Sequence, residues 1–424
     1  MLTFIIDPLS STNYFKLKVL TSLLLLLITL TGFSCKNGDV TTQNVEPILI
    51  DTDHLAIAKA GVENDDPLYR AAFAQLVEDA EVALKSGPYS VTDKQKVAPS
   101  GDKHDYASYS RYWWPDPNKS DGLPYIRRDG ETYPNSQSPK ESDRPRIGEF
   151  GVNTEILGLA YYITGEEKYA QKAAELIRVW FLDSLTYMNP NVNHAQCRLG
   201  HNNGTKSGVL DGRLMIRALE GSLLISKSAE LTDDEYKMLK AWAGEYFKWL
   251  TTNEMALQEA VAENNHGSFY DVQAMYFALY AEDRDAATEI AQSFTETRLL
   301  SQIRPDGSMP AEMARTRPLF YSIYNLHAMS LVAHLAEKVN VDLWKAEDEN
   351  SRLRAGFDYL VPYVDEQNTW PKPTLGKADR MELLAILQMA DRAYPDGNYM
   401  KMAEKLPADR RRKQRTLLAF PLMR

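Results

Sequence analysis

The sequence predicts an all-helical protein built from antiparallel helical hairpins, and three observations support this. From Asp66 onward, apolar residues recur at short helical steps, as at Ala174, Ile177 and Phe181. Short polar loops containing Gly, Asn or Asp separate these stretches, and few strand signals compete with them. Successive helices joined by short loops pack as antiparallel neighbours. About eleven such helices would stack into a solenoid or close into a toroid.

The helices are expected one after another, each ended by a turn signal. Thr164-Gly165, for example, separates two of them. Asp233 and Asp234 lie in a first turn, where the helix dipole favours carboxylates. The expected helices are Pro67–Leu84, Asn153–Thr164, Glu167–Phe181, Val209–Lys227, Thr232–Leu250, Ser268–Tyr280, Asp283–Leu299, Leu319–Lys338, Ser351–Val361, Lys377–Ala393 and Asn398–Lys405.

One long segment, Ser86 to Gly148, has no helical pattern. It is rich in Pro, Gly, Asp, Tyr and Trp. Irregular segments of this length inside a domain are usually functional, as binding loops or covers of an active site. The alternative is that this segment only covers one end of the helical body.

The N-terminus carries an export signal. Lys16 and Lys18 precede an apolar run from Val19 to Phe33, which has the length of a signal-peptide core rather than of a membrane-spanning helix. Cys35 follows almost directly, as at bacterial lipoprotein cleavage sites. We therefore expect a lipoprotein signal peptide at residues 1–34, a tether at 35–65 and the helical domain at 66–424. The alternative is a plain secretory signal in which Cys35 has no role.

Lipidation of Cys35 would anchor the exported protein to the outer membrane, in the periplasm or at its surface. Cys197 would then be the only other cysteine, so that no disulfide framework could form. The absence of a CxxC pair argues against a structural zinc site.

The overall charge excludes one class of partner. The 424 residues have a formal net charge of −10 and are 44% hydrophobic, which is enough to bury a large core. An acidic chain argues against nucleic acid, because phosphate backbones bind basic surfaces. A local cluster of Arg, Lys and His inside a cleft could still hold the carboxylates of a polyanion.

The polar run from Glu263 to Ser268 precedes an apolar helical stretch. Asn264 or Asn265 could cap that helix, and capping needs only one of them. His266 beside two amides at a helix N-terminus would combine amide donors, an imidazole and a positive dipole end. A lone histidine is more often structural, so this alternative stays open.

A second candidate site lies at the start of a later helix. Arg315 and Arg317 are two residues apart, so in an extended segment they face the same side. Pro318 suits the first helical position, and Tyr321 and Tyr324 then share one helix face. The alternative is a surface arginine pair beside a core aromatic stripe.

The segment from Asn191 to Lys206 is too dense in polar residues to form core. It is either a loop lining a cleft or an ordinary exposed loop. Its candidates for substrate contact are His194, Gln196, His201 and Lys206.

The segment from His104 to Pro117 combines aromatic and polar residues. Aromatic rings suit the apolar faces of sugars, but they could also anchor the irregular segment to the helical body. Its candidates for carbohydrate contact are His104, Tyr112, Trp113 and Trp114.

Several motifs follow one another between roughly residues 99 and 344. They are HDY at 104–106, YWWPDP at 112–117, GLPYIRRDG at 122–130, NNHG at 264–267, YDVQ at 270–273, RPDG at 304–307, RTR at 315–317 and YSIYNL at 321–326. In this order they resemble the alginate lyase superfamily of helical toroid enzymes, most closely polysaccharide lyase family 38, a relative of family 5.

The resemblance implies an all-α fold, an incomplete α/α toroid with a cleft at one end, and a lyase acting on an anionic uronate polysaccharide. It implies no catalytic metal, and no cofactor is expected. The family's Asn-His pair falls on Asn265-His266, and its Arg and Tyr fall on Arg317 and Tyr324, with Tyr321 as the nearest rival. The expected substrate-binding residues are Arg315, Tyr321, Asn264, His194, Gln196, His201, Lys206, Tyr112, Trp113, Trp114 and His104.

The reaction that the resemblance implies explains these residue types. Cleaving a 4-linked uronate by β-elimination requires removal of the C5 proton, which is very weakly acidic while the adjacent carboxylate is negative. Arg317 and Asn265 would neutralise that carboxylate. Tyr324, whose ordinary pKa is about 10, would be activated by a nearby cation. It could act as base and acid on mannuronate, whereas on guluronate His266 would be the base and Tyr324 the acid.

Two other functions fit the same helical fold. A glycoside hydrolase needs a pair of carboxylates, and Glu263, Asp271 and Glu312 are available without a marked pair. A glycan-binding lipoprotein without activity would need the aromatic residues but not the Tyr, His and Arg set. The motifs do not choose between alginate and glucuronan as the substrate.

Overall fold

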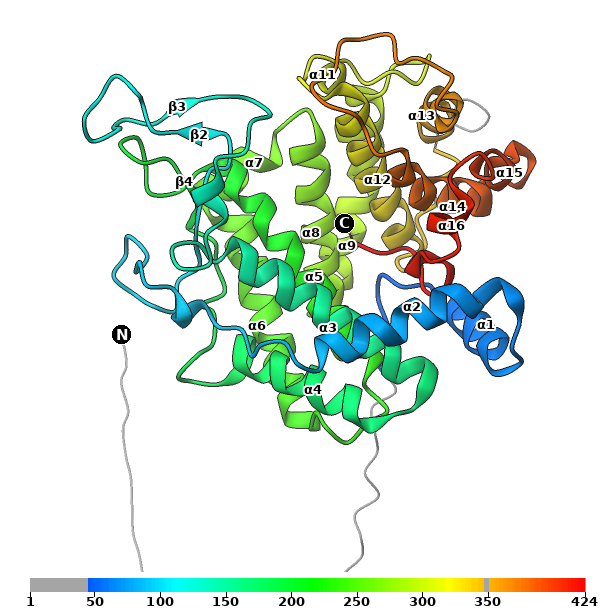
Figure 1. Cartoon of the computed structure of the whole chain (residues 1–424), viewed down its shortest axis with the longest axis horizontal. Coiled ribbons are helices and arrows are strands. Elements are labelled where there is room, and N and C mark those ends of the chain that lie inside the picture. The colour runs from blue at the N-terminus through cyan, green and yellow to red at the C-terminus, as the bar shows by residue number, and fades with distance from the viewer. Residues whose placement is uncertain (1–44, 347–350, 424) are drawn as a thin grey trace, which may run out of the picture. The chain divides into compact units, whose positions relative to one another are not determined.

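Helices dominate the computed structural model, which describes residues 45–346 and 351–423 (Figure 1). Residues 1–34 and Cys35, on which the signal-peptide and lipidation predictions fall, lie outside this range. None of the described helices is long and apolar enough to cross a membrane. The helices are α1 (Thr52–Glu63), α2 (Pro67–Ala83), α3 (Arg144–Thr164), α4 (Glu167–Ile177), α5 (Met215–Leu224), α6 (Asp233–Thr252), α7 (Glu254–Ala260), α8 (Asn265–Tyr280), α9 (Arg284–Phe294), α10 (Leu300–Gln302), α11 (Pro310–Met313), α12 (Pro318–Glu337), α13 (Arg352–Leu360), α14 (Leu383–Ala393), α15 (Tyr399–Ala403) and α16 (Ala408–Arg411).

The main helices alternate between outer and inner positions, as antiparallel hairpins do in an α/α toroid. The inner helices α3, α5, α8 and α12 bury most of their side chains. The outer helices α4, α6 and α9 bury one face each. Neighbouring inner helices touch, α3 with α5 and α8 with α12, and each outer helix packs on the inner helix that follows it. The packing therefore sets the starts of α8 and α12 side by side.

Helix α3 begins earlier than the sequence pattern suggested. It starts at Arg144 rather than Asn153, because Pro145 suits the first helical turn. Asp143, directly before it, accepts the backbone N–H of Ala107 at 2.9 Å and so ties the helix start to the irregular segment. This places the Arg144 side chain at the end of the helical body.

The expected helix Val209–Lys227 is split. Its first part is a 3-10 segment, Lys206–Leu214, and only the second part forms α5. Within the 3-10 segment the chain passes so close to α6 that a Cβ atom on Gly212 would lie 1.8 Å from the hydroxyl oxygen of Tyr246. Only glycine fits there, and this fixes the position of the residues on either side of it.

The irregular segment Ser86 to Gly148 lies over one end of the helical body (Figure 1). Strand β1 (Ala107–Tyr109) pairs in parallel with β4 (His194–Cys197), and β2 (Trp113–Trp114) pairs antiparallel with β3 (Ile126–Arg127). A fully buried ion pair, 3.1 Å between Lys94 Nζ and Asp143 Oδ2, joins the segment to the start of α3. The segment is thus a fixed part of the fold.

From residue 45 to α2 the chain is folded, and this corrects the expected tether at residues 35–65 as far as the structure describes it. Helix α1 buries Leu55 and Ala58, and Asp51 caps it by accepting the backbone N–H of His54 at 2.9 Å. Leu49 and Ile50, just before it, are each 1% exposed. These apolar side chains belong to the core, so the chain from residue 45 onward is part of the folded unit rather than a linker.

A buried carboxylate on α5 fastens this N-terminal segment. Glu220 accepts the backbone N–H groups of Ile48 at 3.1 Å and Ile50 at 3.0 Å. It also accepts the hydroxyl of Tyr276 on α8 at 2.8 Å. Burial raises the pKa of Glu220 above its usual range, and the three donors offset part of that effect.

Replacing Glu220 by alanine is expected to lower the free energy of unfolding by about 2–4 kcal/mol, because two backbone N–H groups and one hydroxyl lose their acceptor in the interior. Denaturant unfolding followed by circular dichroism measures the change. The control is Glu245→Ala on the exposed side of α6, for which a change within about 0.5 kcal/mol is expected. Equally small changes for both variants would contradict the role of Glu220.

Candidate active site

A pocket of 490 Å³ opens at the end of the helical body that carries the irregular segment. That segment, the 3-10 segment Lys206–Leu214 and the starts of α8 and α12 form its walls. Eight cationic and three anionic side chains line it, an excess of five positive charges in a chain of net charge −10. The cationic side chains are Arg111, Arg127, Arg144, Arg198, Lys206, Arg213, Arg315 and Arg317. The pocket therefore suits a polyanion although the whole chain is acidic.

The start of α8 divides two tasks between adjacent asparagines. Asn264 caps the helix by accepting the backbone N–H of His266 at 3.1 Å. Asn265 is 1% exposed, and its amide nitrogen lies 2.9 and 3.0 Å from the two carboxylate oxygens of Glu312. Glu312, on α11, therefore fixes Asn265 at the pocket wall. One asparagine is enough for capping, as the sequence suggested, and the structure shows that it is Asn264.

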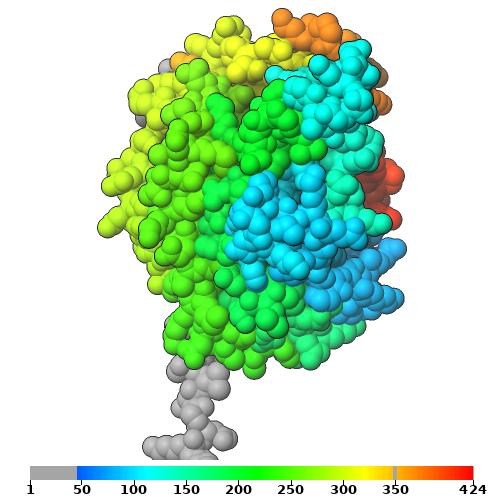
Figure 2. Space-filling view, turned by 90° about the vertical axis from the view of Figure 1, so that its left-hand side faces the viewer, coloured from blue at the N-terminus to red at the C-terminus, as the bar shows by residue number. Residues whose placement is uncertain are grey.

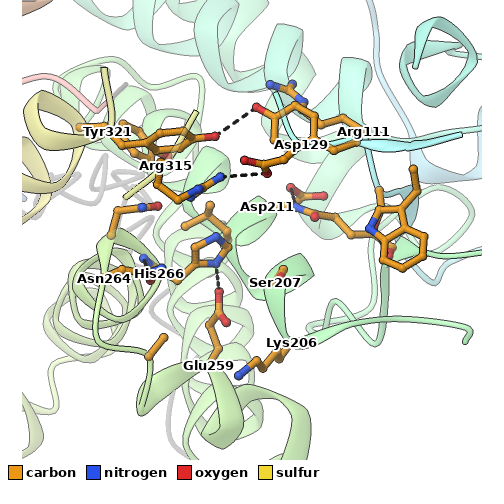
Figure 3. A pocket seen from close by; sticks show the side chains of 18 of the residues that line it. Arg111, Asp129, Lys206, Ser207, Asp211, Glu259, Asn264, His266, Arg315 and Tyr321 are labelled. Atoms are coloured by element: carbon orange, nitrogen blue, oxygen red, sulfur yellow. Dashed lines mark hydrogen bonds and ion pairs between the residues drawn. The ribbon is translucent and has the colours of Figure 1, made fainter. Parts of the chain in front are cut away.

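A carboxylate from α7 holds His266. Its Nδ1 forms a short hydrogen bond with Oε1 of Glu259 (Figure 3). The side chain of Glu259 is 2% exposed, whereas that of His266 keeps 22% exposure where it lines the pocket. A carboxylate at Nδ1 favours the tautomer that carries its proton there. The other ring nitrogen, Nε2, is then left as an acceptor for the pocket.

Arg317 and Tyr324 lie two turns apart at the start of α12, and both line the pocket. The guanidinium carbon of Arg317 lies 4.6 Å from the centre of the Phe320 ring. Within residues 45–346 and 351–423 no ion pair joins Arg317 to a carboxylate, so its charge is available to a ligand. The predicted convergence of this arginine, this tyrosine and the Asn265-His266 pair is present in the structure.

The rival tyrosine, Tyr321, is engaged elsewhere. Its hydroxyl oxygen lies 3.2 Å from that of Tyr112, and the guanidinium of Arg315 lies 3.8 Å from its ring centre. Burial raises the pKa of Tyr321 far above its usual value, and the neighbouring phenol raises it further. Tyr321 therefore ties α12 to the irregular segment, a role that disfavours it as a proton carrier.

Tyr324 lies between aromatic rings and a cation. Its ring centre is 4.3 Å from that of Phe269 and 5.8 Å from that of Phe320, to which it is nearly parallel. The guanidinium carbon of Arg213 lies 5.6 Å from the same ring centre. These contacts come from α8, from α12 itself and from the 3-10 segment, so the ring is held from several sides.

Asp211 organises the inner wall of the pocket. Its carboxylate accepts the hydroxyls of Tyr106 at 3.0 Å and Ser108 at 2.7 Å. It also lies 3.3 Å from Nη1 of Arg144. Burial lowers the pKa of Arg144, but Asp211, Tyr106 and Tyr324 together outweigh this and raise it overall. Arg144 is therefore charged and partly neutralised by its partner.

The irregular segment reaches across to the approach of α12 and bridges one side of the pocket. Asp129 Oδ1 lies 3.4 Å from Nη2 of Arg315 (Figure 3). Its Oδ2 accepts the Thr316 hydroxyl at 3.1 Å. The backbone oxygen of Thr316 in turn accepts the N–H of Leu375 at 2.7 Å. Figure 2 shows the irregular segment (cyan) at the same end of the molecule as the regions of α11 (yellow) and α13 (orange).

The predicted substrate-binding residues fall into two groups. Those that line the pocket are Arg315, Tyr321, Asn264, Gln196, Lys206, Tyr112 and Trp113. The others, His104, His194, His201 and Trp114, are not among the lining residues. They hydrogen-bond instead to the backbone oxygens of Tyr187, Asn203, Tyr125 and Glu131, respectively. For His104 and Trp114 this fits the alternative that their segment is anchored to the rest of the fold, and for His194 and His201 it fits the alternative of an ordinary loop.

Sequence reasoning missed four residues that shape the site. Arg144, Asp211 and Arg213 line the pocket from the start of α3 and from the 3-10 segment, and Glu259 lines it from α7. They come from three separate stretches of sequence, and only the fold brings them together. The one available signal was the charged pair around Gly212, which interrupts an otherwise apolar helical pattern.

The three carboxylates that the sequence offered for a hydrolase are engaged elsewhere. Asp271 forms a buried ion pair with Arg298 at 2.7 Å, Glu312 holds an amide, and Glu263 is exposed. None of the three lines the pocket. In the described part of the chain no three His, Cys, Asp or Glu side chains are grouped as metal ligands.

Comparisons with known proteins agree with this geometry. The family model described as alginate lyase matches residues 90–370. The crystal structure of an alginate lyase from Bacteroides ovatus is similar over 88% of this chain and 98% of that chain, with 37% identity and a TM-score of 0.83. No curated protein matches the chain.

More distant structures share the fold. Alginate lyase A1-III from Sphingomonas species A1 is 15% identical, with a TM-score of 0.56 over 89% of this chain and 97% of that chain. A histidine-to-alanine variant of alginate lyase A1-III complexed with a tetrasaccharide is 16% identical, with a TM-score of 0.53 over 85% and 98%. The predicted all-α toroid is confirmed.

Replacing Asp129 by alanine is expected to loosen the bridge over the pocket, because two contacts to the approach of α12 are lost. At about 0.5–1.5 kcal/mol per contact, the two contacts amount to about 1–3 kcal/mol, so backbone amides of residues 125–133 should exchange with solvent about 5- to 150-fold faster. Hydrogen exchange followed by mass spectrometry measures this. Glu131→Gln, an exposed position in the same loop, is the control and should leave exchange unchanged. Identical exchange in both variants would mean that Asp129 does not hold the loop.

Proposed function

The chain belongs to the alginate lyase family and is a polysaccharide lyase, and we propose that it cleaves 4-linked uronate polymers, alginate first among them, in the pocket described above. The observation that carries this proposal is the excess of cations in an acidic chain, gathered around Tyr324, His266, Asn265 and Arg317. A uronate polymer presents one carboxylate per sugar, which such a pocket can neutralise. The assignment to polysaccharide lyase family 38 stays a prediction.

The first task is to make the C5 proton removable. Arg317, which has no carboxylate partner among the described residues, is placed to bind the substrate carboxylate and to stabilise the enediolate that develops on it. Asn265 contributes from an amide that Glu312 keeps in place. Such groups are effective because they are fixed before the substrate arrives.

Tyr324 carries the proton transfer in this proposal. On a mannuronate-type sugar, its oxygen takes the C5 proton, and the C5–H electron pair forms the C4–C5 double bond. The C4–O4 bond breaks, and the leaving O4 takes a proton from Tyr324. Proton and electron pair are thus both accounted for, with an unsaturated sugar and a new chain end as products.

His266 becomes the base when the C5 proton lies on the opposite face, as in guluronate. The hydrogen bond of Glu259 to Nδ1 leaves Nε2 as the acceptor for that proton. Tyr324 then serves only as the acid. Glucuronan remains a second substrate candidate, because the same groups would meet its carboxylate.

Replacing Tyr324 by phenylalanine is expected to lower the rate of product formation about 100- to 10,000-fold, because the proton carrier is lost while the ring remains. The ultraviolet absorbance of the unsaturated uronate measures the rate on polymannuronate, polyguluronate and glucuronan. Tyr321→Phe is the matched control and should keep most of the activity. His266→Ala should reduce cleavage of polyguluronate more than cleavage of polymannuronate.

A Tyr324→Phe variant as active as the unchanged protein would remove Tyr324 from this role. Loss of activity in Tyr321→Phe alone would assign the role to Tyr321. If the unchanged protein cleaved glucuronan but neither polymannuronate nor polyguluronate, the proposed substrate would be wrong, whereas the proposed reaction type would stand.

We also propose that the protein is exported and anchored to the outer membrane by a lipid on Cys35, as the order of charged, apolar and cysteine residues at the N-terminus suggests. Labelling with a radioactive fatty acid in a Gram-negative host should mark the mature chain that begins at Cys35, and this chain should be found in the membrane fraction. Cys35→Ser should remove the label. An unlabelled, freely secreted protein with Cys35 intact would contradict the anchor.

A further inference from the structure

Arg213 is a buried cation with few partners of its own. It is 7% exposed, and its Nη1 donates to the backbone oxygen of Leu210 at 2.9 Å. Its Nε is buried without a hydrogen-bond partner, and no carboxylate in residues 45–346 and 351–423 forms an ion pair with it. An unpaired buried charge opposes folding, so a position that keeps one calls for a functional reason.

The guanidinium of Arg213 faces the proton carrier. Its central carbon lies 5.3 Å from the ring centre of Phe269 and 5.6 Å from that of Tyr324. These two rings are themselves in contact, with their centres 4.3 Å apart. Arg213 therefore packs on these two rings rather than pointing into solvent.

We propose that Arg213 is the positioning residue that makes Tyr324 a base, by supplying the positive charge that stabilises its phenolate form. This proposal rests on the function proposed above, because it acts only through Tyr324. Since Arg213 is charged before the substrate binds, the phenolate is favoured without any rearrangement during the reaction.

The electrostatics of Arg213 support this pairing. Burial lowers the pKa of Arg213, and the largest effect that raises this pKa comes from Tyr324. Electrostatic coupling between two groups is reciprocal. A Tyr324 phenolate that raises the pKa of Arg213 is therefore itself stabilised by the positive charge of Arg213.

Other charged groups face the same region, and they act less directly. Arg144 from α3 is also coupled to Tyr324, but Asp211 neutralises part of its charge. The charge of Arg111, from the irregular segment, lowers the pKa of Arg213. His266 and Arg317 line the same pocket. His266 is hydrogen-bonded to Glu259, and Arg317 is assigned above to the substrate carboxylate. Arg213 is thus the cation left for Tyr324.

The test compares Arg213→Gln, which removes the charge, with Arg213→Lys, which keeps it. The value of kcat/KM on polymannuronate is measured against pH. In Arg213→Gln the rising part of the pH profile (its ascending limb) should move to higher pH by about 1–3 pH units, which is the effect of losing one cation at this distance. Activity at neutral pH should fall about tenfold for each pH unit by which the limb moves, and it should recover at high pH. Arg213→Lys should keep the limb close to its original position.

Arg198→Gln is the matched control, because Arg198 lines the same pocket but its guanidinium lies over Trp113, at 4.6 Å from the ring centre. Its limb should stay in place whatever happens to KM. An equal loss of activity at all pH values in Arg213→Gln would reduce Arg213 to packing and overturn the proposal. If Arg213→Gln does not fold, Arg213→Met provides the neutral variant.

A second measurement needs no substrate and so separates this proposal from the proposed function. The absorbance of ionised phenol is titrated for proteins with and without Tyr324→Phe, and the difference reports Tyr324 alone. With Arg213→Gln this difference titration should move to higher pH. An unmoved titration overturns the role of Arg213 even in a fully active lyase. A protein that cleaves no uronate polymer but shows the move to higher pH would instead overturn the proposed function alone.

Discussion

The contact between α8 and α12 decides where the reacting groups lie. Both helices are apolar almost all round and bury nearly every side chain along their length. Since neither can rotate without exposing core, their first turns are fixed relative to each other. Asn265 and His266 occupy the first turn of α8, and Arg317 and Tyr324 lie at the beginning of α12. The packing of the helical core therefore fixes the positions of the reacting groups, and the loops add the remaining walls of the pocket.

The pocket also shows how an acidic protein can hold a polyanion. Its cations are gathered at one end of the helical body, and the carboxylates nearby are mostly used to fix other groups. Glu312 holds an amide, Glu259 holds an imidazole, and Asp129 bridges to the approach of α12. The remaining cations face the space where a substrate carboxylate would lie. The stability given up by burying charge in this way is a common feature of active sites.

The elements that the sequence predicted well were those whose information is local. The apolar periodicity of α4, α6 and α9 marks one buried face, and the asparagine cap and Pro318 mark the starts of α8 and α12. The segment from Val45 to Glu63 was predicted wrongly because it has few apolar residues and is held in the core by hydrogen bonds to Glu220, about 170 residues away. Arg213 was missed for the same reason, since it acts on Tyr324, far along the chain, whereas Glu259 lies only seven residues before His266 but on a separate helix. The aromatic residue Trp114 fits both a sugar platform and a loop anchor, and only its hydrogen bond to the backbone of Glu131 points to the second.

The central claim is that one pocket brings the substrate carboxylate to Arg317 and the C5 proton to Tyr324. The most direct measurement is a crystal structure of the Tyr324→Phe variant bound to a uronate oligosaccharide. The account predicts that one sugar carboxylate lies within hydrogen-bond distance of the Arg317 guanidinium, with C5 facing the ring at position 324 or Nε2 of His266. A sugar whose carboxylate binds only at Arg198 or Lys206, with C5 turned away from both groups, would contradict it.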